Sequence, residues 1–118
     1  FPHNLAKLQK ENGGYDILKA SPQGNSLVKD FAEATILGEN MGKGAFTDFL
    51  ALSFSSTDYI GHMYGVDSKE IEDTYIRLDQ DIADLLNFLD TQVGIANYTV
   101  FFNSRPCGCT CTSLSKIT

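Results

Sequence analysis

The stretch Thr57-Asp-Tyr-Ile-Gly-His62, which directly follows the apolar run Phe49-Leu-Ala-Leu-Ser-Phe54, decides the expected fold. An apolar run without clean alternation is typical of a strand covered on both faces, as in parallel sheets. Such strands deliver polar ligands to the crevice at their carboxyl ends. We therefore expect Asp58 and His62 to reach one point there, where a carboxylate and an imidazole can bind a divalent metal.

The same pair has a plainer interpretation, a helix-capping aspartate and a surface histidine. An Asp-x-x-x-His spacing taken alone favours that interpretation, because it is common in proteins of every class. Its position directly after a buried strand is what favours a metal site. His3 has no such context and is expected on the surface.

A long helix should follow the pair. Asp67 is expected as its N-cap, with Glu70 three residues on as in a capping box. Gly94 is expected to end it, and the many acidic residues between the apolar positions should form its solvated face. The apolar stripe of this helix consists of Ile71, Tyr75, Leu78, Ile82, Leu85 and Leu89.

Residues 98–102, Tyr-Thr-Val-Phe-Phe, are expected to form a second buried strand. Strand, helix and strand at these lengths predict a βαβ unit with parallel strands. The predicted fold class is therefore α/β, with a parallel sheet and flanking helices. Residues after Phe102 should emerge beside Asp58 and His62, because neighbouring parallel strands end at the same edge of the sheet.

The first forty residues predict smaller elements. A short helix is expected near residues 5–8 and a short strand over 15–19. After a turn signal, Asn25 or Ser26 is expected to cap a second helix that ends at Gly38. The apolar positions of that helix recur at helical spacing: Leu27, Val28, Phe31 and Ala34 or Thr35.

Composition excludes some classes of function. The net charge of the 118 residues is −6, which argues against nucleic acid as a partner, since phosphate neutralisation needs clustered Lys and Arg. No apolar run is long enough to span a bilayer, and the first residues lack the pattern of a signal peptide. The chain begins with Phe1 and not with Met, so it is expected to be an internal piece of a longer protein whose localisation cannot be read here.

The run from Asp48 to His62, Asp-Phe-Leu-Ala-Leu-Ser-Phe-Ser-Ser-Thr-Asp-Tyr-Ile-Gly-His, resembles the alkaline phosphatase superfamily. Within it, the run is similar to the type I phosphodiesterase/nucleotide pyrophosphatase branch and to the phosphate-monoesterase alkaline phosphatases allied to that branch. Residues 13–16, 24–26 and 72–79 also resemble the second group. The resemblance covers residues 1–102 and implies part of an alkaline-phosphatase-like catalytic domain.

This resemblance implies a two-zinc phosphohydrolase that cleaves small-molecule phosphate esters through a covalent phospho-enzyme. Asp58 and His62 would match two of the three ligands of one zinc. The family's Thr or Ser nucleophile lies upstream of the matched segment, so no catalytic residue is assigned here, and the 55–57 Ser-Ser-Thr run is interpreted as strand-end and turn residues. Overall similarity favours monoesters. A phosphodiesterase, sulfatase-like or phosphoglycerate-mutase-like member is the alternative, and export to the periplasm or beyond is typical of the family.

The fragment itself is expected to be inactive and to bind zinc weakly or not at all, because it lacks the nucleophile segment and the remaining ligands. The competing class is a non-catalytic, truncated interaction domain that docks through the acidic helix over residues 67–90. Extending the reading frame in both directions distinguishes these classes: a catalytic domain needs a Thr nucleophile upstream and a further His downstream.

The last residues, 103–118, depart from the family pattern. All three cysteines, Cys107, Cys109 and Cys111, lie there at alternate positions, which is not the spacing of a zinc knuckle. In the family the matching strand runs into Leu-Thr-Ala-Asp-His, which binds the other zinc. Synonymous codons for 103–112, read one base later, can encode Thr-Ala-Asp-His. We therefore hypothesise that 103–118 is an out-of-frame tail, which a verified in-frame coding sequence would refute.

Overall fold

The computed structural model describes residues 4–11 and 14–104. His3 and the three cysteines of the proposed out-of-frame tail lie outside these residues. The chain begins with α1 (Leu5–Glu11) and the 3₁₀ helix η1 (Gly14–Ala20). The short first helix is thus confirmed, but the strand predicted over 15–19 is wrong. The segment closes on itself through local bonds such as Ser21 N to Leu18 O at 3.2 Å, so its backbone needs no neighbouring strand.

Helix α2 (Pro22–Gly38) begins earlier than predicted. Its N-cap is Ser21, because Pro22 presets the helical φ angle and has no N–H to leave unpaired at the first helical position. The predicted cap at Asn25 or Ser26 is therefore wrong. Gly38 is the last residue of the helix, close to the predicted end.

The second half contains α3 (Ser56–Tyr64), α4 (Lys69–Leu89) and the π-helical turn η2 (Asp90–Gly94). The long helix is confirmed, and Gly94 ends its π-helical extension. Its N-cap is Ser68 and not Asp67, because the Ser68 hydroxyl accepts a bond from Ile71 N at 3.2 Å.

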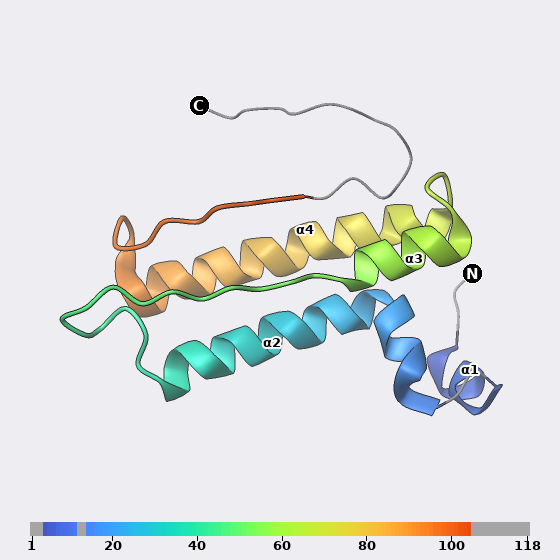
Figure 1. Cartoon of the computed structure of the whole chain (residues 1–118), viewed down its shortest axis with the longest axis horizontal. Coiled ribbons are helices and arrows are strands. Elements are labelled where there is room, and N and C mark those ends of the chain that lie inside the picture. Colours follow the sequence, from blue (N-terminus) through green and yellow to red (C-terminus); the bar gives the residue numbers. More distant parts are fainter. Residues whose placement is uncertain (1–3, 12–13, 105–118) are drawn as a thin grey trace.

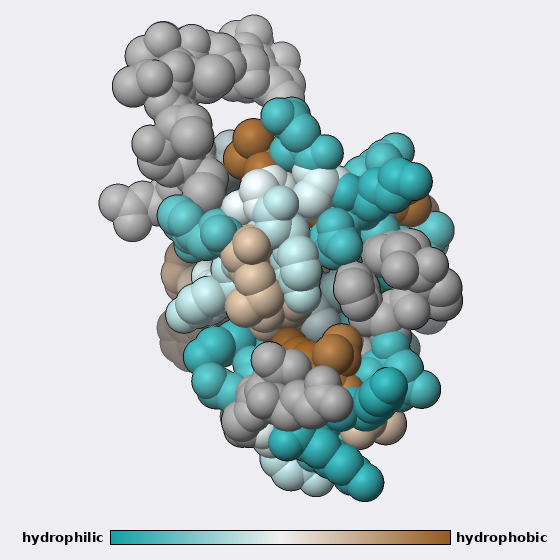
Figure 2. Space-filling model, turned by 90° about the vertical axis from the view of Figure 1, so that its right-hand side faces the viewer, coloured by the Kyte–Doolittle hydropathy of each residue, from teal (hydrophilic) through white to brown (hydrophobic). Residues whose placement is uncertain are grey.

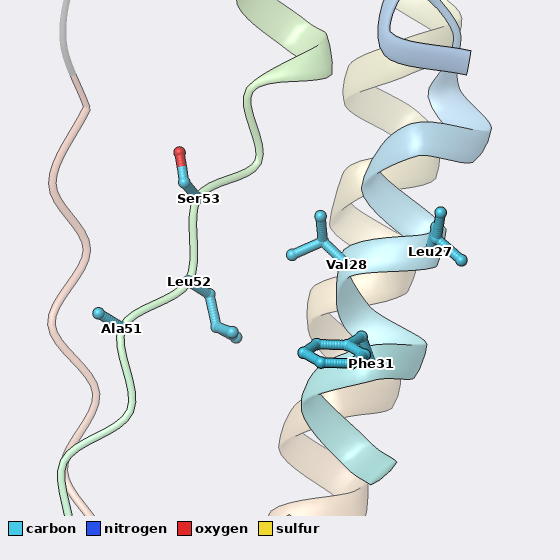
Figure 3. Close-up of a pocket in the computed structure, with 6 residues that line it drawn as sticks. All are labelled: Leu27, Val28, Phe31, Ala51, Leu52 and Ser53. Atoms are coloured by element: carbon cyan, nitrogen blue, oxygen red, sulfur yellow. The ribbon is translucent and has the colours of Figure 1, made fainter. Parts of the chain in front are cut away.

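The residues that the structure describes include no β-strand, so the predicted parallel sheet is not formed within them. Residues 47–54 and 98–104 are instead extended segments. The two segments run in the same direction, and α2 and α4 run in the opposite direction (Figures 1 and 3). Parallel strands alternate with antiparallel helices in the same way in an α/β layer, but the hydrogen bonds between strands are not formed within the described residues. The sheet is not formed within these residues because the two segments are not covered: Phe49 and Phe101 are each 88% exposed, whereas parallel strands are stable when both of their faces are buried.

A small core lies between the helices. Helix α4 packs against α2 and α3, and Ser26 Oγ donates to Asp81 Oδ2 at 2.8 Å across the α2–α4 contact. Tyr75, predicted in the buried stripe, is 59% exposed, and the smaller Thr74 takes the buried position. The buried apolar residues are Ala20, Ala32, Ile36, Ile60, Ile71 and Leu85.

Much of the apolar surface remains uncovered. Phe31 of α2 is 74% exposed, and the extended segments also expose large aromatic side chains. Figure 2 shows that one end of the molecule is mostly hydrophilic, with small separate hydrophobic patches. Within the described ranges, none of the helices combines the length and apolar character needed to cross a bilayer.

Candidate functional site

The two predicted metal ligands lie on α3. Asp58 is in its first turn and His62 in its last turn. Residues four apart share one face of a helix, and the structure places Asp58 Oδ1 3.6 Å from His62 Nε2. The two side chains therefore meet as expected, but helical periodicity brings them together and not a loop at the end of a strand.

Both side chains are open to solvent. The His62 side chain is 64% exposed and that of Asp58 is 61% exposed. Asp58 also lies where a negative charge is favourable, because the N-terminal turn of a helix carries partial positive charge. A cation can therefore approach the two donor atoms from the open face of α3.

The separation of the donor atoms fits one metal ion. Two atoms bound to one tetrahedral zinc at bond lengths of ~2.0–2.2 Å lie about 3.4 Å apart. The observed 3.6 Å between the carboxylate oxygen and the imidazole nitrogen is close to that value. In the part of the chain that the structure describes, no group of three or more His, Cys, Asp or Glu side chains is placed to hold a metal. Two donor atoms are fewer than a zinc site requires, so a metal held here would need further ligands.

The opposite face of α3 holds the helix in place. Ile60 is 1% exposed, and a Cβ added at Gly61 would lie 3.7 Å from Ile71 Cδ1 on α4. Helix α3 thus packs on α4 with a close approach at Gly61, and Ile60 is buried beside it in the sequence. Asp58 and His62 lie on the solvent-exposed face of the helix.

A side chain that sequence reasoning missed holds the start of α3. Asn25 of α2 is 1% exposed, and its Nδ2 donates to Thr57 Oγ1 at 3.1 Å. The sequence contains one signal that could have found it. Asn25 precedes the buried Ala32 and Ile36 by seven and eleven residues, so it lies on the same helical face. A polar residue on a buried face needs a partner.

An apolar groove of about 460 Å³ lies between α2 and the extended segment 47–54. Phe31 and Val28 of α2 face Leu52 across it (Figure 3). Among the described residues, none of the side chains that line the groove is ionisable, so they supply no group for acid–base chemistry. Its lining consists of Leu27, Val28, Phe31, Ala51, Leu52 and Ser53.

Comparisons with known proteins identify the same family that the sequence around Asp58 resembles. Residues 17–105 match the family described as Type I phosphodiesterase / nucleotide pyrophosphatase. The chain is 55% identical over 106 residues to a protein of Myroides odoratus named calcium-transporting ATPase, covering 88% of this chain and 19% of that protein. It is 46% identical over 104 residues to the alkaline phosphatase PhoV of Synechococcus elongatus, covering 88% and 18%.

The alkaline phosphatase PafA of Elizabethkingia meningoseptica is 46% identical over 105 residues, which is 88% of this chain and 19% of PafA. The crystal structure of wild-type PafA matches this fold with a TM-score of 0.77 at 44% identity, covering 83% of this chain and 19% of the PafA chain. The chain therefore spans about a fifth of the length of these relatives. It belongs to the type I phosphodiesterase/nucleotide pyrophosphatase family of the alkaline phosphatase superfamily.

Proposed function

We propose that this chain is part of a two-zinc phosphohydrolase that cleaves phosphate esters, and that Asp58 and His62 bind one of its zinc ions. The observation that carries this proposal is the 3.6 Å separation of their donor atoms on one exposed helix face. The alkaline phosphatase names of PhoV and PafA support the substrate class and favour monoesters. Cleavage of phosphodiesters is the alternative, because the matching family is described by that activity.

The roles of the two residues follow from their chemistry. Asp58 supplies a carboxylate oxygen, and His62 supplies a neutral imidazole nitrogen as the second ligand. Bound zinc polarises a phosphoryl oxygen and lowers the pKa of a bound hydroxyl or water. The nucleophile that would form the phospho-enzyme lies outside this chain, as do the other ligands.

The same proposal accounts for the uncovered extended segments. In the complete enzyme, 47–54 and 98–102 would be neighbouring strands of a parallel sheet, and residues 1–102 would be part of the catalytic domain. The match to PafA at a TM-score of 0.77 supports this placement, because PafA continues far beyond the matched region. Further chain would supply the missing ladder partners and cover Phe49 and Phe101.

Titration of the 118-residue protein with zinc chloride, followed by NMR signals of the His62 ring, tests the ligand assignment. We expect weak binding, because two ligands hold zinc poorly. Asp58→Asn should abolish the zinc-dependent shifts of the His62 ring, whereas Asp79→Asn, which removes an exposed carboxylate from α4, should not. Unchanged zinc shifts of the His62 ring in Asp58→Asn would refute the proposed pair. We expect no turnover of nitrophenyl phosphate by this chain alone.

A further inference from the structure

Asn25 links α2 to the turn that carries Asp58. It is one of the largest fully buried side chains, at 1% exposure, and it lies thirty-two positions from Thr57 in the sequence. Its Nδ2 donates to Thr57 Oγ1 at 3.1 Å. Thr57 immediately precedes Asp58, so this bond holds the residue next to the candidate metal ligand.

Stability does not explain the choice of asparagine. The Oδ1 atom of Asn25 is buried and has no hydrogen-bond partner among the described residues. A buried acceptor without a partner destabilises the folded state, and a small apolar residue would avoid that penalty. The side chain is therefore suited to an interaction that specifies geometry, with the bond to Thr57 as the one it makes.

The neighbouring residue points to the same contact. A Cβ added at Gly24 would clash with the hydroxyl oxygen of Ser56, and it would lie 2.5 Å from the carbonyl oxygen of Leu18. Only a glycine lets α2 approach Ser56 so closely. Two consecutive residues of α2 therefore contact two consecutive residues of α3, immediately before Asp58.

We propose that Asn25 is a positioning residue for the Asp58–His62 pair and acts through Thr57. Its amide fixes the Thr57 side chain in the first turn of α3. That turn sets the direction in which the Asp58 carboxylate leaves the helix, and hence its separation from His62 Nε2. This inference rests on the proposed function, since it concerns the alignment of the same two ligands.

The test uses the complete 118-residue chain and zinc ions as the probe. Asn25→Ala and Thr57→Val each remove the bond, whereas Thr57→Ser retains the hydroxyl. The matched control is Ser26→Ala, which removes a hydrogen bond that runs from the adjacent residue of α2 to Asp81 of α4. Two quantities are measured by NMR under conditions in which each variant is folded. They are the zinc dissociation constant, from the His62 ring signals, and the χ1 coupling constants of Asp58 without metal.

We expect Asn25→Ala and Thr57→Val each to raise the zinc dissociation constant about fivefold and to average the Asp58 χ1 couplings. The double variant should be no worse than either single one, because both changes remove the same bond. Thr57→Ser and Ser26→Ala should stay within about twofold of the wild type.

Two results would overturn the inference in distinguishable ways. If Asn25→Ala has the same zinc affinity and the same χ1 couplings as Ser26→Ala, the positioning role is refuted and the proposed metal pair is unaffected. Wild-type protein whose His62 signals do not respond to zinc would refute zinc binding by the Asp58–His62 pair in this chain, and this inference with it.

Discussion

Replacing Gly24 by alanine sets helix propensity against steric packing. Gly24 lies inside α2, where alanine is better than glycine by about 1 kcal/mol in an exposed helix interior. Propensity alone thus predicts a more stable protein. The tertiary contact predicts the opposite, because the new Cβ would clash with the Ser56 hydroxyl and lie 2.5 Å from the carbonyl oxygen of Leu18.

The steric effect should be larger. Inserting a methyl group into a packed contact costs about 1–3 kcal/mol, and the Leu18 oxygen belongs to the backbone, so no side-chain rotation can relieve it. Subtracting the propensity gain from the steric cost leaves a net loss of up to about 2 kcal/mol in the free energy of unfolding. Adding Ser56→Ala to Gly24→Ala should recover only part of this loss, since it removes the hydroxyl contact and leaves the Leu18 contact.

Urea unfolding followed by far-UV circular dichroism measures this difference. The Gly24→Ala midpoint should fall by about 1 M urea with an unchanged slope. Gly38→Ala is the matched control, because no atom lies within 4 Å of a Cβ added there at the end of the same helix. That variant should be as stable as the wild type or slightly more so. Gly24→Ala with a midpoint at or above that of Gly38→Ala would show that α2 does not approach α3 as described.

Two further changes test the surface and the second extended segment. Phe31→Ser should reduce self-association, measured by light scattering during gel filtration, without lowering the urea midpoint, because Phe31 is 74% exposed. A large fall in the midpoint would place Phe31 in the core instead. The hydrogen bond from Tyr98 Oη to Asp90 Oδ1, at 2.7 Å, raises the pKa of the Tyr98 phenol. A raised folded-state pKa stabilises the protein below the unfolded value of about 10, and this contribution is lost as pH rises through the folded value. Tyr98→Phe should therefore lower the thermal midpoint at pH 8 and have a smaller effect at pH 11, and an equal effect at both would contradict the assigned bond.

Local patterns predicted the long helices well. The apolar periodicity over 71–89 identified α4 (Lys69–Leu89), and the glycine at 94 marked the end of its π-helical extension. Helix starts were less accurate: the cap of α4 is one residue later than predicted, and that of α2 is four residues earlier than Asn25. Several residues near each start can cap a helix, and their side-chain and backbone geometry selects among them.

The candidate site was predictable in its residues and not in its setting. The Asp-x-x-x-His spacing and the surrounding motif identified Asp58 and His62. Sequence reasoning placed them beyond a strand, whereas they belong to a helix that begins at Ser56. The position of Asn25 on the buried face of α2 indicates that it needs a polar partner, but no local pattern identifies Thr57, thirty-two residues away, as that partner.

Residue types and short spacings were sufficient to identify the family, the helix periodicity and the two candidate metal ligands, because each of these depends on local sequence. Contacts between distant parts of the chain set which face of α3 is exposed and how closely Gly24 and Asn25 approach its first turn. They also leave segments 47–54 and 98–104 extended without a ladder. Apolar character can predispose a segment to be a strand, but hydrogen-bonded neighbours and cover on both faces must come from other parts of a fold.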